Sequence, residues 1–229
     1  MTFAVDETLF SVMMNYCVGI VIAERVQSGN QHPEVEQLLA EHMSQAREKI
    51  GGEAASRSNP VQPYREAYEK LGMDPEQYIS SIEYLLSQAS RGRGIPMINP
   101  ISDLVTAISL KYLVPIGAYD MDAVDDRLDV RFAEEGDMFS PYGDEEGEQQ
   151  ETIEPGEVVY ASGNSVKTRK WIWRQSERGK IRDDSSRLIM PIEGFEGINK
   201  DRVIEARDEL ASYLSESFGA AVSTGYLNY

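Results

Sequence analysis

A strongly apolar segment between two prolines constrains the fold of this chain most. Asn99 can accept a hydrogen bond from a first-turn amide, and Pro100 has no amide to leave unpaired, so the pair predicts the start of a helix. Apolar residues then recur at roughly helical spacing until Pro115 ends the helix, namely Leu104, Ile108, Leu110, Leu113 and Val114. The pattern predicts a buried helix that places the sequence PIGAYD, residues 115–120, at a defined point of the fold.

The rest of the chain divides into a helix-rich first half and a strand-rich second half. The first half predicts a strand near residue 2, a helical turn at 7–13, a buried strand at 18–22, a helix at 33–50 and two short helices within 57–94. The second half predicts strands at 128–132, 158–161, 166–173 and 188–192, an amphipathic helix at 201–218 and an edge strand in the tail. With no repeat and no linker, we expect one domain, residues 1–229, of the α/β (α+β) class, a layered β-sandwich covered by helices.

The apolar content of the chain is enough for a core but not for a membrane helix. A chain of 229 residues buries roughly 70% of its unfolded surface on folding. The longest apolar run, residues 16–23, is far shorter than the ~20 residues of a membrane-spanning helix. Cys17 lies in this run and is the only cysteine, so we expect it buried and without a disulfide. We therefore expect a cytoplasmic protein with no membrane partner.

Charge is segregated along the chain. The net charge of −17 argues against nonspecific binding of nucleic acid, and we expect no DNA partner. Ten acidic residues and no Lys or Arg lie in 134–157, whereas eight Lys or Arg and three acidic residues lie in 167–187. The first segment predicts an exposed acidic loop. Two interpretations of the second stay open: ordinary basic residues on an exposed strand, or a basic patch that contacts RNA.

Common catalytic and metal-binding motifs are absent from the sequence. There is no Gly-rich phosphate loop, no Gly-x-Ser-x-Gly elbow and no His-Glu-x-x-His helix. His32 and His42 stand apart and, with a single cysteine, give no metal-ligand spacing. We therefore expect neither a metal nor a cofactor.

The segment RKWIWRQSERGKIRDDS, residues 169–185, combines aromatic and basic side chains. In a strand, Trp171 and Trp173 would share one face, and Lys170, Ile172 and Arg174 would share the other. Aromatic rings interleaved with arginine are typical of surfaces on which nucleotides stack. The same alternation is also that of a strand with one face in the core, and the two interpretations stay open.

Six blocks of this sequence together resemble a known family. The blocks are YREAYEKLG, SSIEYLL, GIPMINPISDLVTAISLKYLVPIGAYDMD, LDVRFAEEGDMF, EPGEVVY and RKWIWRQSERGKIRDDS, in this order between about residues 60 and 195. They are similar to freestanding relatives of the editing domain of the phenylalanyl-tRNA synthetase β subunit. The resemblance implies an α/β layered unit with a pocket that, in the synthetase, hydrolyses tyrosine wrongly esterified to the phenylalanine tRNA. It does not imply a synthetase, because the rest of the β subunit has no counterpart here.

The resemblance also implies a set of pocket residues. The synthetase has histidine where this chain has Gly117 and asparagine where it has Thr106, so specificity for tyrosine is not implied. Pro115, Ile116 and Gly117 would form one wall of the pocket, with Thr106 beside them. The pocket glutamate of the family falls on Glu177. Without the resemblance, Glu177 is equally well a surface residue of a basic segment.

The function implied is the hydrolysis of an aminoacyl ester. Such an ester is already activated, so a positioned water, donors for the oxyanion and an anchor for the ammonium group suffice. Backbone amides near Gly117 would be the donors, and Glu177 would bind the ammonium group or orient the water. Lys170, Arg174 and Arg178 would contact the tRNA.

We therefore expect a trans-acting editing hydrolase that deacylates mischarged or non-protein aminoacyl-tRNA. The alternative is a non-catalytic module that binds an amino acid-like ligand, a tRNA acceptor end or a partner protein.

Overall fold

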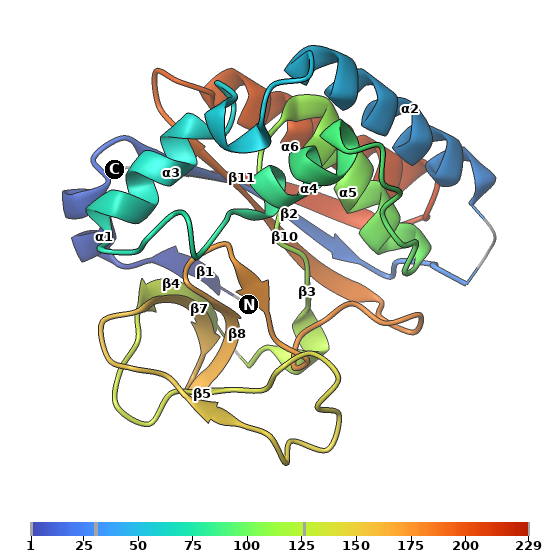
Figure 1. Ribbon diagram of the computed structural model, residues 1–229. Helices are drawn as coiled ribbons and strands as arrows, with labels where there is room; N and C mark the ends of the chain where they lie inside the picture. The colour runs from blue at the N-terminus through green and yellow to red at the C-terminus, as the bar shows by residue number, and fades with distance from the viewer. Residues whose placement is uncertain (1, 30–31, 126, 229) are drawn as a thin grey trace.

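Two β-sheets pack against each other, and the helices lie mainly around the smaller one (Figure 1). The computed structural model describes residues 2–29, 32–125 and 127–228. The helices are α1 (Glu7–Val12), α2 (Pro33–Ile50), α3 (Gln62–Lys70), α4 (Ser81–Ser90), α5 (Pro100–Tyr112) and α6 (Lys200–Glu216). The strands are β1 (Thr2–Val5), β2 (Tyr16–Glu24), β3 (Tyr119–Asp120), β4 (Arg127–Phe132), β5 (Met138–Phe139), β6 (Glu151–Thr152), β7 (Val158–Ser162), β8 (Ser165–Arg169), β9 (Arg174–Gln175), β10 (Arg187–Phe195) and β11 (Ala221–Asn228). The α/β class and the layered sheets predicted from the sequence are confirmed.

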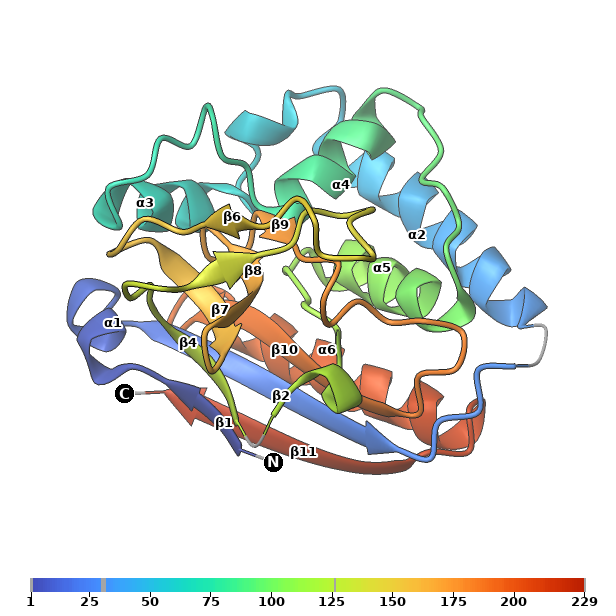
Figure 2. The same ribbon diagram turned by 90° about the horizontal axis from the view of Figure 1, so that it is seen from below.

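The smaller sheet is antiparallel and has the order β11-β2-β10-β3 (Figure 2). Its β-branched residues alternate between two covered faces. One face packs against α5 and α6, and the other faces the larger sheet. Gly194 allows α6 to approach closely, because a Cβ there would lie 2.3 Å from Cγ2 of Val203. The predicted edge strand in the tail is confirmed as β11.

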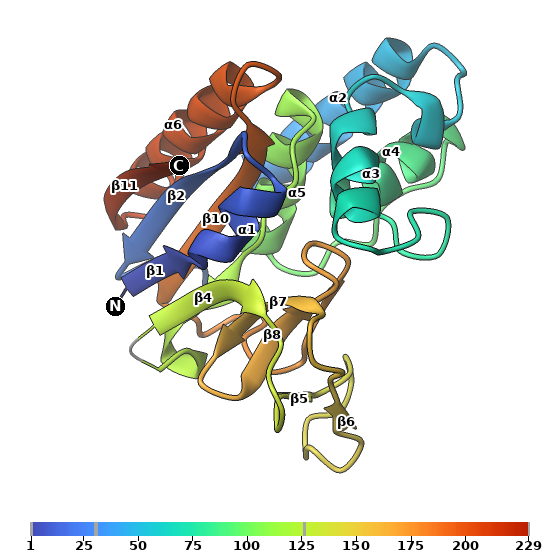
Figure 3. The same ribbon diagram turned by 90° about the vertical axis from the view of Figure 1, so that its left-hand side faces the viewer.

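The larger sheet has the order β1-β4-β7-β8-β5-β6, with β9 paired to β8 (Figure 3). β1 and β4 run parallel, so the start of the chain is tied to its middle. This sheet and the smaller one enclose most of the aromatic core.

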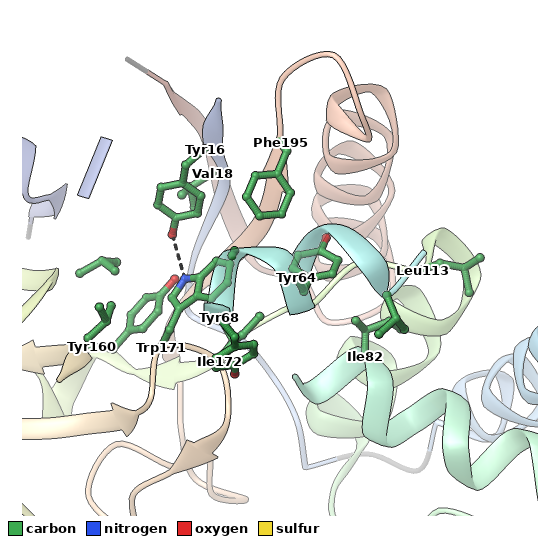
Figure 4. Packing of buried hydrophobic residues seen from close by; sticks show 14 of the residues in the cluster. Tyr16, Val18, Tyr64, Tyr68, Ile82, Leu113, Tyr160, Trp171, Ile172 and Phe195 are labelled. Atoms are coloured by element: carbon green, nitrogen blue, oxygen red, sulfur yellow. Dashed lines mark hydrogen bonds between the residues drawn. The ribbon is translucent and has the colours of Figure 1, made fainter. Parts of the chain in front are cut away.

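The centre of that core is Trp171, whose side chain is fully buried (Figure 4). Its ring meets those of Tyr16 and Tyr68 edge-on, with centroids 5.7 and 5.8 Å apart. Its Nε1 donates a 3.4 Å hydrogen bond to the Tyr16 hydroxyl. Tyr64 and Phe195 complete the cluster. Strands β2 and β10 of the smaller sheet and helix α3 therefore all pack against one side chain.

The helix bounded by prolines forms as its sequence predicts. The Asn99 side chain accepts a 2.9 Å hydrogen bond from the Ser102 amide, and Pro100 is the first helical residue. Leu113 ends the helix in a left-handed conformation, with φ of 57°. Most of its apolar side chains are buried in the cluster shared with α6. Helix α5 therefore holds the segment that follows it, residues 113–118, in a fixed place.

The predicted strand at 166–173 is wrong beyond Arg169. Lys170 and Trp171 have positive φ angles of 48° and 60°, which turn the chain sharply. Trp171 enters the core, while Trp173 lies half-buried beside Tyr78. The two tryptophans therefore do not share a strand face.

The acidic segment 134–157 is not fully exposed, contrary to expectation. It contains the short strands β5 and β6, and Phe139 and Ile153 are buried. The buried Asp137 carboxylate pairs with Arg131 at 2.7 Å and accepts a hydrogen bond from the Glu134 amide. Through β5 and β6, the segment forms one edge of the larger sheet.

No helix in the described part of the chain is both long and apolar enough to cross a membrane. Cys17 is buried and free, as predicted.

Candidate functional site

A pocket of about 230 Å³ opens between α5, the segment after it and the larger sheet. Its floor includes Glu193 of β10, Tyr160 of β7 and Thr168 of β8. Its rim includes Tyr142 from the acidic segment and Trp173 from the turn after β8. Segments far apart in the sequence thus meet here, because the lining takes residues from both sheets.

Thr106, Pro115, Ile116 and Gly117 all line this pocket, as does Tyr119 of β3. The Thr106 hydroxyl donates a 2.8 Å hydrogen bond to the Ser102 carbonyl of its own helix. Towards a ligand, the hydroxyl oxygen can therefore only accept a hydrogen bond, and the methyl group can make apolar contacts. The structure therefore places Thr106 and the three residues expected to form one wall in the same pocket.

The Gly117 amide is already used by the fold. It donates a 2.9 Å hydrogen bond to the carbonyl of Pro191 in β10, so it is not a free donor for an oxyanion. A Cβ at this position would lie 3.0 Å from Cε2 of Tyr119 and 3.3 Å from Cγ of Pro191. A side chain larger than hydrogen would therefore press on the Tyr119 ring and reduce the pocket.

Glu177 is buried but is not part of the pocket lining. Its carboxylate forms an ion pair with Lys180, which does line the pocket, and accepts a 3.0 Å hydrogen bond from the Gly143 amide. Burial alone would raise the pKa of Glu177, but these two hydrogen bonds outweigh it and hold the pKa below its usual value. Glu177 therefore fixes Lys180 and the loop at Gly143 rather than facing a ligand directly.

Glu193 is the acidic residue that does line the pocket, and the sequence patterns did not identify it. Its side chain is 0% exposed, its Oε2 accepts a hydrogen bond from the Tyr16 hydroxyl, and its Oε1 has no hydrogen-bond partner among the described residues. Burial raises the pKa of this carboxyl to about 8. The available signal was a single carboxylate in the otherwise apolar run LIMPIEGF.

Aromatic and polar groups surround this carboxyl. Tyr119 stacks on Tyr160 with ring centroids 5.5 Å apart, and its hydroxyl forms a 2.7 Å hydrogen bond with Oγ1 of Thr168. The Tyr160 hydroxyl is buried without a partner among the described residues. Gln175 is tied to the wall by a 2.7 Å hydrogen bond from Nε2 to the Ala118 carbonyl. The pocket is thus mostly apolar, with two unpartnered oxygens at its floor.

Much of the positive charge of segment 167–187 is neutralised by carboxylates of the acidic segment 134–157. The segment therefore does not form a freely solvated basic patch. Lys170 pairs with Glu157 at 2.9 Å, and its side chain is only 20% exposed. Arg174 lies 3.9 Å from Glu151. Arg178 is exposed and forms no ion pair with any described residue. Of the three predicted tRNA contacts, Arg178 is therefore the cation with its charge most available.

In the described ranges 2–29, 32–125 and 127–228, no group of three or more His, Cys, Asp or Glu side chains is placed to hold a metal ion. His42 is buried and its Nδ1 lies 2.9 Å from the Ala107 carbonyl, while His32 stacks on Phe218 at 4.1 Å. Both histidines therefore have structural contacts away from the pocket.

Comparison with known proteins identifies the family. The sequence model of the B3/4 domain matches residues 63–219, which include α3 to α6 and most of the pocket. An N-terminal fragment of the phenylalanyl-tRNA synthetase β-subunit from Pyrococcus horikoshii is similar in structure, with a TM-score of 0.47 and 14% sequence identity over 96% of this chain. This chain spans 50% of that structure's chain. No curated protein sequence matches it. Because the B3/4 match covers more than half of the residues, the chain belongs to the B3/4 domain family.

Proposed function

We propose that this protein is a trans-acting editing hydrolase that releases amino acids from mischarged or non-protein aminoacyl-tRNA. The observation that carries the proposal is the pocket itself, where Thr106 and residues 115–117 form a wall and Glu193 provides a buried carboxyl. Membership of the B3/4 family supports the same activity. In this reaction water adds to the ester carbonyl, the terminal ribose oxygen leaves with a proton, and the amino acid is released.

Lys180 is the best-placed group to stabilise the oxyanion of that reaction. It lines the pocket, and its ammonium lies 4.9 Å from the Tyr142 ring centre at the rim. Fixed charge aimed at a developing oxyanion is worth more in a partly enclosed site than in water. Glu177, expected from the resemblance to contact substrate, acts in this proposal through Lys180 and is a positioning residue.

Filling the pocket is expected to abolish deacylation. Gly117→Leu places a branched side chain against Tyr119 and Pro191, where even a Cβ has no spare room. Release of amino acid from a panel of mischarged tRNAs, measured in single turnover, should fall to the uncatalysed rate. Gly94→Leu is the matched control, because a Cβ at Gly94 would meet nothing within 4 Å and that glycine is outside the pocket.

If wild-type protein releases no amino acid from any substrate of the panel, the hydrolase proposal is refuted. Equal rates for Gly117→Leu and wild type would instead move the activity to another part of the chain.

Binding of tRNA is expected to depend more on Arg178 than on Lys170. The Lys170 ammonium is already paired with the buried Glu157 carboxylate, whereas Arg178 has no such partner among the described residues. Arg178→Ala should lower affinity and reduce the slope of log affinity against log salt by roughly one. Lys170→Ala should change both quantities less. Fluorescence titrations with tRNA at several salt concentrations measure this, and the reverse order would contradict it.

A non-catalytic binding module is the second candidate. The favouring observation is that the Gly117 amide and the Glu177 carboxylate, both expected to act in catalysis, are engaged in the protein's own bonds. Stabilisation by an amino acid-like ligand without release from any aminoacyl-tRNA would favour this candidate.

A further inference from the structure

The Glu193 carboxyl is a buried acid without a counter-charge. It forms no ion pair with any residue that the structure describes, and only its Oε2 has a hydrogen-bond partner. Buried polar atoms of native proteins nearly always have a partner, so an unpartnered carboxylate oxygen requires an explanation. Because Glu193 also lines the pocket, the missing partner can come from a ligand.

The titratable groups nearest to Glu193 are phenols. Tyr16 lies on β2, Tyr64 and Tyr68 on α3, and Tyr119 on β3. None of them carries a positive charge. Lys180, the cation among the described lining residues, forms an ion pair with Glu177. A cationic ligand would therefore meet no competing charge at the pocket floor.

We propose that Glu193 binds a primary ammonium group of the ligand, with Oε1 as the acceptor. An ammonium group has three donors and no acceptor, so it can donate to Oε1 of Glu193; the Tyr160 hydroxyl, also unpartnered, lines the same pocket. The rings of Tyr119 and Tyr160 line the same pocket and favour a cation through their π faces.

This assignment adds to the proposed function the part of the ligand that Glu193 recognises. It rests on the proposed function for the identity of the natural ligand, an aminoacyl ester. Such a ligand carries an ammonium group at its α-carbon and, in lysine-like amino acids, a second one at the end of the side chain. Both offer the same chemistry to Glu193, so the test must separate them.

Three small probes make that separation. L-Leucinamide has only an α-ammonium group, Nα-acetyl-L-lysinamide has only a side-chain ammonium group, and Nα-acetyl-L-leucinamide has none. At pH 7 we expect at least one of the first two to bind and raise the melting temperature, and the third to have no effect. Which of the two binds more tightly identifies the ammonium group that is recognised.

Glu193→Gln is expected to weaken binding of the recognised probe by about ten- to a hundredfold, the usual value of a hydrogen bond to a charged group. The variant should fold, because the amide oxygen of glutamine can accept the Tyr16 hydrogen bond. Glu83→Gln is the matched control, since Glu83 is also buried with one unpartnered oxygen but lies outside this pocket. Glu83→Gln should bind the probe as wild type does.

Proton release provides a readout that a purely structural glutamate would not show. Burial holds the pKa of Glu193 at about 8, so at pH 7 the carboxyl of the empty pocket is mostly protonated. Binding of an ammonium group should expel this proton, and calorimetry in buffers of different ionisation enthalpy should detect it for wild type and not for Glu193→Gln.

The proposal is overturned if neither ammonium probe binds, if Nα-acetyl-L-leucinamide binds equally well, or if Glu193→Gln binds unchanged. None of the probes contains an ester, so their binding is independent of hydrolysis. Ammonium binding without deacylation would refute the proposed function and leave this assignment in place.

Discussion

The Glu193→Gln variant is expected to gain stability relative to wild type as the pH rises from about 4 to 8, and to be equally stable only below about pH 4. Burial raises the pKa of Glu193 to about 8, whereas a glutamate in the unfolded chain titrates near its usual value of about 4.3. Between these values the folded protein holds a proton that the unfolded chain has released. The free energy of unfolding of wild type therefore falls as pH rises, by up to about 1.4 kcal/mol per pH unit, until the folded carboxyl ionises. Glutamine does not ionise, so the free energy of unfolding of the variant does not fall in this way.

Urea denaturation of both proteins from pH 5 to pH 9 measures the difference. Glu157→Gln is the control, because the pKa of Glu157 is shifted in the opposite direction. Burial alone would raise that pKa, but hydrogen bonds from Arg169 and Lys170 outweigh burial and lower it. Its loss of stability should therefore be constant over this range. Parallel curves for wild type and Glu193→Gln would show that Glu193 is ionised throughout, and the prediction would fail.

Trp171→Ala is expected to lower the free energy of unfolding by about 3–5 kcal/mol, the usual cost of removing a large buried aromatic side chain. Trp171 is fully buried and contacts the rings of Tyr16, Tyr68 and Phe195. Its loss leaves a cavity between both sheets and α3, and removes the Nε1 donor to Tyr16.

Trp173→Ala, two residues away, is the matched comparison. Trp173 is half-buried and packs edge-on against Tyr78, so its removal should cost only about 1 kcal/mol. Because Trp173 lines the pocket and Trp171 does not, Trp173→Ala should weaken binding of the ammonium probe more than Trp171→Ala does, as long as both proteins are folded. Equal losses in the free energy of unfolding for the two variants would contradict the different burial of the two tryptophans.

Features set by the local chain were predictable from the sequence. Helix α5 begins as expected, because Asn99 and Pro100 act on backbone groups within a few residues, and it ends at Tyr112, slightly before the expected stop at Pro115. The class of fold followed in the same way, from a helix-rich half and a strand-rich half. The wall at residues 115–117 was predicted by family resemblance, and it lies in the pocket because α5 is fixed at both ends.

Features that depend on distant contacts were not predictable. The turn at Lys170 follows a run with strand propensity, and it is held by a 2.9 Å hydrogen bond from the Lys170 amide to the Glu157 carboxylate and by burial of Trp171. Charge segregation was visible in the sequence, but the pairing of Lys170 with Glu157 and of Arg174 with Glu151 was not. Glu193 was visible only as a polar residue in an apolar strand, since its unpartnered oxygen is a property of the assembled pocket.

Strand β10 belongs to the core and to the pocket at once. It pairs with β2 along its whole length and with β3 beside the pocket, and it supplies Pro191, Glu193 and Phe195 to the same face. The rim residues Tyr142 and Trp173 lie in irregular segments instead. Replacements at the rim therefore cost little stability, whereas a replacement in β10 must be matched by one in β2 or α3. During evolution, new ligand preferences should accordingly arise first at the rim, and lineages that change the floor should show paired substitutions in the neighbouring strand or helix.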